Sequence, residues 1–207
     1  MSAPVTPLVF QPPEVPEDQA RAGYYALLAR LFYASPDAPL LESIAAAGEM
    51  GAGEQSALAG AWNALAAAAG AMDAEAARIE YDQLFVGTGK SEVTLYTTFY
   101  LSETGREKIL VRIRAELASL GLGRAERALE PEDHIAGLFD AMRYLISLGS
   151  DEAALRKQQE FFDRYIARAW EKLCVAISAS EKANFYKHVA RFAEAFLIVE
   201  SEALKVF

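Results

Sequence analysis

The chain has 207 residues, a formal net charge of −9 at neutral pH and a hydrophobic content of 53%. This length and apolar content suit one domain with a sizeable core. The acidic balance argues against a nucleic-acid partner, because such binders draw much of their affinity from Lys and Arg on phosphates. A single cysteine, Cys174, excludes a disulfide framework and all-cysteine metal sites.

The first 16 residues are rich in proline, which blocks both helices and sheet ladders. We therefore expect a flexible leader over residues 1–16 and one all-helical domain over residues 17–207. No run reaches the roughly 20 apolar residues that a membrane span needs, and the first residues lack the basic start of a signal peptide. These features predict a cytoplasmic protein with no stable membrane insertion.

Apolar spacing of three and four residues predicts four helices in the first half of the chain. The first begins at Glu17 and is ended by Pro36. The others are predicted over residues 39–48, 55–71 and 73–86, the last with Asp73 as its cap. One apolar face is predicted in the first helix, with Tyr24, Leu27, Leu28, Leu31 and Phe32, and the third has Leu58, Trp62, Leu65 and Ala69 in register. In the fourth the apolar positions Ile79, Leu84 and Phe85 lie among acids.

The second half opens with an irregular, aromatic-rich loop over 87–102, whose run VTLYTTFYL is β-prone but too isolated to form a sheet. Helices are predicted over 103–120, over 131–149, over 151–177 with Ser150 or Asp151 as cap, and from 180 to the end, with a break at 121–130. The apolar positions are Ile135, Leu138, Phe139, Met142, Leu145 and Ile146, then Phe185, Val189, Phe192, Phe196 and Val199. The expected fold is all-α, a single-domain bundle of about eight helices.

The stretch GTGKS, at 87–91, matches the second half of a phosphate-binding loop. Such a loop needs a first glycine where this chain has Leu84, and it lies between a strand and a helix. The preceding residues ARIEYDQLF are helical in pattern, so glycines that end a helix are the simpler interpretation. A small helical protein that binds or hydrolyses GTP through Lys90 and Ser91 remains the alternative.

The inventory of chemical groups predicts neither a metal site nor an enzyme. The two histidines, His134 and His188, do not form the paired Glu-x-x-His motifs of a helical metal site. Nucleophile-elbow, zinc-protease and dinucleotide-binding motifs are also absent from the sequence. We therefore expect no cofactor and no catalytic residue.

The segment LEPEDHIAGLF, at 129–139, has the pattern of a helix start. Pro131 suits the first helical position, and Glu130, Glu132 and Asp133 complement the positive end of the helix dipole. The same dipole disfavours imidazolium, so His134 should be largely neutral. An Asp beside a His at this position can offer an acceptor and a tunable donor to a bound segment.

Two segments together, EYDQLFVG at 80–87 and EPEDHIAGLF at 130–139, resemble the TorD/DmsD family of all-helical cytoplasmic chaperones for molybdenum oxidoreductases. The resemblance implies that the protein binds the twin-arginine signal peptide, the apoprotein, or both, of a molybdopterin oxidoreductase. It implies that the protein holds this client back from export until the cofactor has been inserted. It implies peptide contacts at Tyr81, Leu84, Phe85, Asp133 and His134. Family members often carry a Pro- and Trp-containing segment where this chain has TGKSEVTLYTTFY. Because the loop differs from the family pattern, the resemblance does not indicate which molybdoenzyme is the client.

A physical picture of the site follows from these segments. Tyr81, Leu84 and Phe85 are three and four residues apart and should share one helix face. With Asp133 they would build an apolar cleft with an acid at its lip, matched to a basic pair followed by an apolar stretch. Whether the protein is a monomer or a homodimer is left open, since helix exchange between subunits leaves no mark in this sequence.

Overall fold

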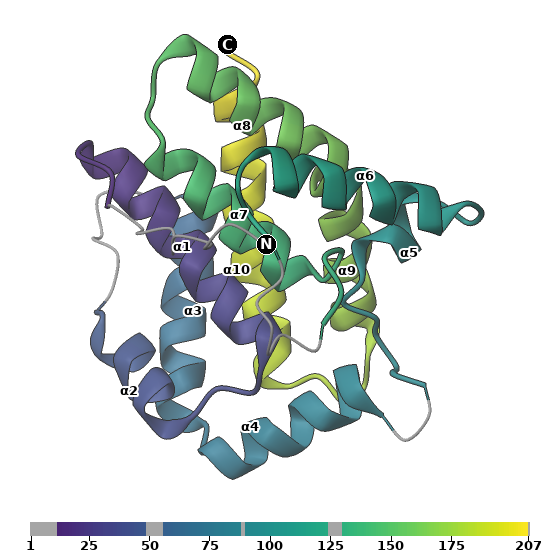
Figure 1. Ribbon diagram of the computed structural model, residues 1–207. Coiled ribbons are helices and arrows are strands. Elements are labelled where there is room, and N and C mark those ends of the chain that lie inside the picture. The colour runs from purple at the N-terminus through teal and green to yellow at the C-terminus, as the bar shows by residue number, and fades with distance from the viewer. Residues whose placement is uncertain (1–11, 49–55, 88–89, 124–129, 207) are drawn as a thin grey trace, which may run out of the picture.

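The computed structural model describes residues 12–48, 56–87, 90–123 and 130–206. Within these ranges the chain forms ten α-helices, one short π-helix and no strand, so the predicted all-α fold is confirmed (Figure 1). The elements are α1 (Pro16–Tyr33), α2 (Ala38–Ala46), α3 (Ala57–Ala71), α4 (Ala74–Tyr81), η1 (Asp82–Val86), α5 (Thr97–Leu101), α6 (Arg106–Ser119), α7 (Ile135–Ser147), α8 (Glu152–Tyr165), α9 (Ala167–Ala179) and α10 (Phe185–Leu204). Residues 1–11 of the expected flexible leader lie outside the described residues.

Three helices form the centre of the molecule. Helix α1 packs along α7, and α10 packs against α3 and α9 (Figure 1). The six apolar positions predicted for the second-half helix are all buried in α7, as are four of the five predicted in α10. Their apolar area, removed from water, is the main term that holds the bundle together. No described helix is both long and apolar enough to cross a lipid bilayer.

Helix boundaries depart from the sequence pattern in the second half. The single helix predicted over 151–177 is divided at Ile166, where α8 ends and α9 begins. Asp151 caps α8, as predicted, by accepting the N–H of Ala154 at 2.8 Å. No Pro or Gly marks this division in the sequence. Buried residues recur every three or four positions through α8, Ile166 and α9, so the apolar spacing alone predicts one continuous helix. One further helical turn, α5, lies inside the predicted loop.

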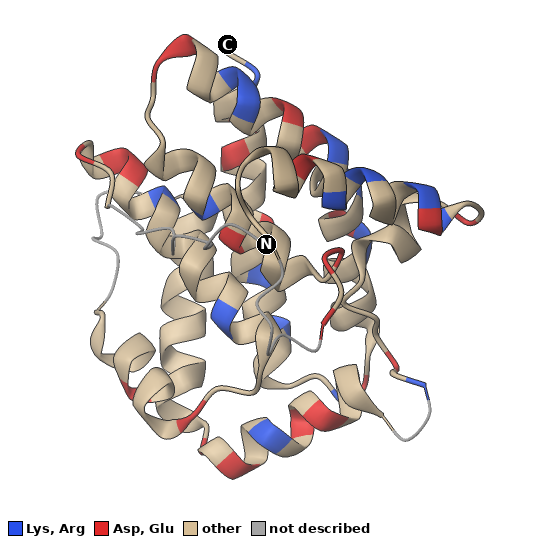
Figure 2. Cartoon of the chain, viewed as in Figure 1, with Lys and Arg blue, Asp and Glu red and all other residues tan. Residues whose placement is uncertain are grey.

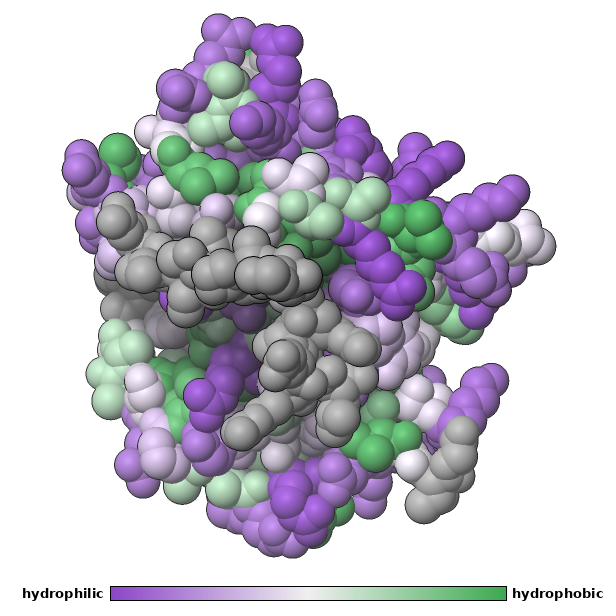
Figure 3. Space-filling model, in the orientation of Figure 1, coloured by the Kyte–Doolittle hydropathy of each residue, from purple (hydrophilic) through white to green (hydrophobic). Residues whose placement is uncertain are grey.

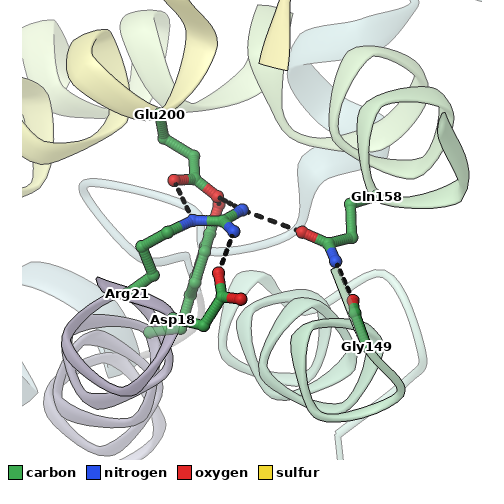
Figure 4. A network of polar contacts seen from close by, with 6 residues as sticks. Asp18, Arg21, Gly149, Gln158 and Glu200 are labelled. Atoms are coloured by element: carbon green, nitrogen blue, oxygen red, sulfur yellow. Dashed lines mark hydrogen bonds and ion pairs between the residues drawn. The ribbon is translucent and has the colours of Figure 1, made fainter. Parts of the chain in front are cut away.

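A buried ion-pair network joins α1, α8 and α10 (Figure 4). The Arg21 guanidinium donates to both carboxylate oxygens of Glu200 at 2.9 and 2.7 Å, and also to Asp18 and Gln158. Glu200 is only 2% exposed, while its neighbour Val199, which the apolar stripe placed inside, is 51% exposed. That expectation is wrong because the network turns Glu200, rather than Val199, toward the core.

The first sequence segment begins with an acid that caps the last helix. The Glu80 carboxylate is buried and accepts the backbone N–H groups of Asn184, Phe185 and Tyr186 at 2.8 to 3.0 Å. Those groups open α10 and would otherwise lack partners. Ile79, one of the apolar positions noted in this helix, is exposed. Glu80 therefore fixes α4 to α10, a contact between residues more than 100 positions apart.

Candidate functional site

An extended strap, residues 93–97, lies between the two sequence segments and ties them together. Val93 N–H donates to the Leu84 carbonyl at 2.9 Å on one side. On the other side, the Leu95 carbonyl accepts from Ile135 at 2.9 Å, and Thr97 N–H donates to the Asp133 carbonyl at 2.8 Å. Tyr96 and His134 thereby face each other as an isolated antiparallel bridge. The structure therefore brings the segments at 80–87 and 130–139 together, through an intermediate piece of chain.

The three residues of the first segment that were predicted to contact a peptide, Tyr81, Leu84 and Phe85, belong to the hydrophobic core. Leu84 and Tyr81 are buried, and the Tyr81 hydroxyl donates to the Phe32 carbonyl at 3.0 Å. The Phe85 ring is partly buried and contacts the rings of Tyr81 and Tyr186 edge-on at 5.1 and 4.9 Å. Tyr81 is the last residue of α4, whereas Leu84 and Phe85 lie in the π-helix η1 that follows it, and such wider turns are common at functional sites.

Asp133 does not stand at the lip of a cleft. Its side chain is buried, with the residue 4% exposed, and one carboxylate oxygen accepts from the Thr98 hydroxyl at 2.5 Å. Its backbone carbonyl also accepts the Thr97 hydroxyl at 3.2 Å. The expectation of an exposed acid at this position is wrong, because Thr98 of α5 bonds the carboxylate and Thr97, the last residue of the strap, bonds the backbone carbonyl. Asp133 serves to hold the strap against the start of α7.

His134, the fifth predicted residue, caps α7. Its Nδ1 accepts the N–H of Ala136 at 3.3 Å, which requires a neutral ring with the proton on Nε2. Burial lowers the pKa of His134, with the nearby carboxylates of Glu130 and Asp133 opposing the shift. The expected neutral state is thus supported, with burial as its main cause. Helix α7 begins at Ile135, so Pro131 is not the first helical residue; residues 133–135 instead pair with the strap.

The titration of His134 predicts a measurable pH effect on stability. Because its pKa is lowered in the folded protein, the unfolded chain binds the extra proton below about pH 6.5, and the free energy of unfolding should fall there as pH decreases. In His134→Asn the cap is kept without the titration. Denaturant curves from pH 7.5 to 5 should show the wild type losing stability relative to the variant, by up to about 1.4 kcal/mol per pH unit. Parallel losses in both proteins would contradict this assignment.

A pocket of about 290 Å³ opens between α6, α7 and the turn at 130–134. Its apolar lining includes Leu117, Leu122, Ala136 and Ala141, and Figure 3 shows hydrophobic surface in the region where Figure 1 places α6. Three acids, Glu130, Glu132 and Asp140, also line it, and no described Lys or Arg does. The turn that leads into α7 is correspondingly red in Figure 2. Of the five predicted contact residues, His134 alone is in the lining.

The comparison with known families decides the identity of the chain. Residues 52–175, more than half of its length, match the nitrate reductase delta subunit family. The chain belongs to this family. No curated protein matches the chain. The family comprises NarJ/TorD-like chaperones for molybdoenzymes, so the resemblance drawn from the two segments is confirmed. Membership supports a chaperone role in molybdoenzyme maturation and not an enzymatic one.

In this delta-subunit family member the GTGKS stretch lacks the setting of a phosphate loop. The residues before it form α4 and η1, not a strand. Gly87 has φ +61°, and a Cβ there would lie 2.5 Å from the Lys90 carbonyl oxygen, so the glycine serves a tight turn. Residues 88 and 89 lie outside the described residues. The described geometry gives the nucleotide-binding alternative no support. Among the described residues, no three His, Cys, Asp or Glu side chains gather where they could hold a metal ion.

Sequence reasoning missed the pocket residues of this chaperone other than His134. Tyr33 ends α1, Glu130 precedes α7, and Leu117 lies in α6, so three separate elements supply them. Tyr33 carried the only local signal: it lies outside the predicted apolar face of its helix and is 53% exposed. A large exposed aromatic beside an acid indicates a binding surface, but the sequence does not show that Glu130 is its neighbour.

Proposed function

We propose that this protein is a cytoplasmic chaperone that binds the twin-arginine leader of a molybdopterin oxidoreductase at the α6–α7 pocket. It holds the apoprotein until the cofactor has been inserted and export can proceed. The observation that carries the proposal is the pocket itself, with apolar walls, an acidic rim and no described cation in its lining. A leader with a basic pair followed by an apolar stretch is complementary to both parts.

Apolar contact should supply most of the affinity. Burial of apolar area contributes about 25 cal/mol per Å², whereas an exposed ion pair contributes at most about 1 kcal/mol. The buried residues of the first segment take an indirect part in this scheme. Leu84 binds the strap through its carbonyl, Tyr81 and Phe85 belong to the same hydrophobic core, and Asp133 fastens the strap to the start of α7. The net charge of −9 favours association with a basic leader by raising the encounter rate.

A glycine in the pocket lining permits a direct test. A Cβ added at Gly137 would meet nothing within 4 Å, so a larger side chain can start there, and we expect a leucine to occupy part of the pocket. Gly137→Leu should weaken binding of a synthetic leader peptide by about tenfold or more, since burying a leucine-sized apolar group contributes about 1.5–3 kcal/mol. Titration calorimetry of the full chain measures the effect.

The matched control is Gly60→Leu on α3, an exposed helical glycine that also has open space around it and does not line the pocket. Both changes should raise helix stability slightly, because glycine is unfavourable inside a helix by about 0.5–1 kcal/mol. Equal leader binding by the two variants, or no leader binding by the wild type, would remove the basis for the proposal.

A further inference from the structure

We propose that Glu130, together with Tyr33, Tyr96 and His134, forms a receptor for a single arginine side chain and discriminates against lysine. This inference rests on the proposed leader binding at the α6–α7 pocket and assigns the part of that site that reads the basic residue. Sequence reasoning gave that role to Asp133, which the structure buries.

Glu130 differs from the other two acids of the pocket in its partners. Glu132 is paired with Arg114 at 2.8 Å, and Asp140 lies 3.6 Å from Arg143. Among the described residues, Glu130 has no such cation, and its carboxylate accepts only the Tyr96 hydroxyl, at 2.7 Å. A carboxylate held by one phenol keeps free acceptor positions, since an ionised carboxylate offers about four. Glu130 is therefore the acid that an incoming cation can pair with at least cost.

Neutral aromatic groups lie near Glu130. The rings of Tyr33 and Tyr96 lie 6.4 and 5.6 Å from the His134 ring, both nearly perpendicular to it. Tyr33 is 53% exposed and Tyr96 is 37% exposed, so both rings are accessible to a ligand. Burial and the hydrogen bond to Glu130 raise the pKa of Tyr96 to about 12, which keeps that phenol protonated as a donor. Such rings attract a cation through their faces.

This arrangement favours guanidinium over ammonium. A guanidinium is planar, so it can donate two parallel hydrogen bonds to the free positions of Glu130 while it stacks on a tyrosine ring. Lysine offers a compact, strongly hydrated charge without that fork. The Nε2 proton of His134 has no acceptor among the described residues and can donate to a backbone carbonyl of the leader. Because Glu130 is the one acid in the described lining without a cation partner, the site holds one arginine.

The test compares four leader peptides that differ only in the basic pair: Arg-Arg, Lys-Arg, Arg-Lys and Lys-Lys. Wild-type protein should bind Arg-Arg about tenfold more tightly than Lys-Lys, the size of one charged hydrogen bond. One of the two mixed peptides should bind like Arg-Arg and the other like Lys-Lys. Glu130→Gln, which keeps an acceptor for the Tyr96 hydroxyl, should reduce the preference to about twofold or less.

Glu132→Gln is the control, because Glu132 is already paired with Arg114. The Glu132→Gln protein should prefer arginine peptides as strongly as the wild type does. Tyr96→Phe, which frees the Glu130 carboxylate to move, should reduce the preference in part. Equal binding of all four peptides, an undiminished preference in Glu130→Gln, or equal losses from both mixed peptides would overturn the receptor while leaving leader binding intact. Failure of every peptide to bind would overturn the proposed function and the receptor together.

Discussion

Replacing Arg21 with alanine is expected to lower the free energy of unfolding by about 3–5 kcal/mol, because removal of one partner leaves a buried charge uncompensated. The guanidinium makes four hydrogen bonds to three side chains at 2.7 to 2.9 Å. Glu200 would retain only the Tyr25 hydroxyl, at 3.3 Å. Urea denaturation followed by circular dichroism measures the loss.

Two companion variants separate burial from charge. Arg30→Ala removes an ion pair to Asp37 in which both side chains are more than half exposed, and it should cost at most about 1 kcal/mol. The double variant Arg21→Met with Glu200→Leu should recover much of the loss, since apolar replacement of a buried pair is often neutral. A loss for Arg21→Ala no larger than that for Arg30→Ala would show that the network does not stabilise the fold.

Replacing Glu80 with alanine should lower the free energy of unfolding by about 2–4 kcal/mol. Three backbone N–H groups at the start of α10 would lose their shared acceptor, and each buried unsatisfied group costs about 1–3 kcal/mol unless water reaches it. Glu80→Gln, with one acceptor oxygen, should lose about half as much, because charged hydrogen bonds are roughly twice as strong as neutral ones.

Glu75→Ala is the matched control on the same helix. Its carboxylate pairs with Arg78 at the surface, so its removal should change stability far less than the removal of Glu80 does. Hydrogen exchange adds a local readout: amides in the first turn of α10 should exchange faster in Glu80→Ala and at the wild-type rate in Glu75→Ala. Unchanged exchange and stability in Glu80→Ala would contradict the capping role.

Much of the fold could be predicted from apolar spacing, because a helix that packs on one side must repeat its apolar residues every three or four positions. Helix α7 shows this fully, since each of its six predicted core residues is buried. The pattern failed where a distant partner decides which residue turns inward. Glu200 enters the core in place of Val199 only because Arg21, 179 positions away, meets it there.

The candidate site was predicted in part. That the segments at 80–87 and 130–139 come together could be inferred from their resemblance to a family, and the strap at 93–97 supplies the physical link. The sequence did not reveal which acid remains available. The Asp133 carboxylate is buried against a threonine hydroxyl from α5, whereas the Glu130 carboxylate is less buried and accepts a tyrosine hydroxyl of the strap, and neither contact is visible in the sequence.

Mapping the bound leader tests the central claim most directly. A leader peptide with a photoreactive group in its apolar stretch would be cross-linked to the wild-type chain, and the attachment sites located by mass spectrometry. We predict cross-links to α6 and the first half of α7, around Leu117 and Gly137, and their loss in Gly137→Leu but not in Gly60→Leu. Cross-links confined to the α2–α3 side of the molecule, or spread over its surface, would contradict binding at the α6–α7 pocket.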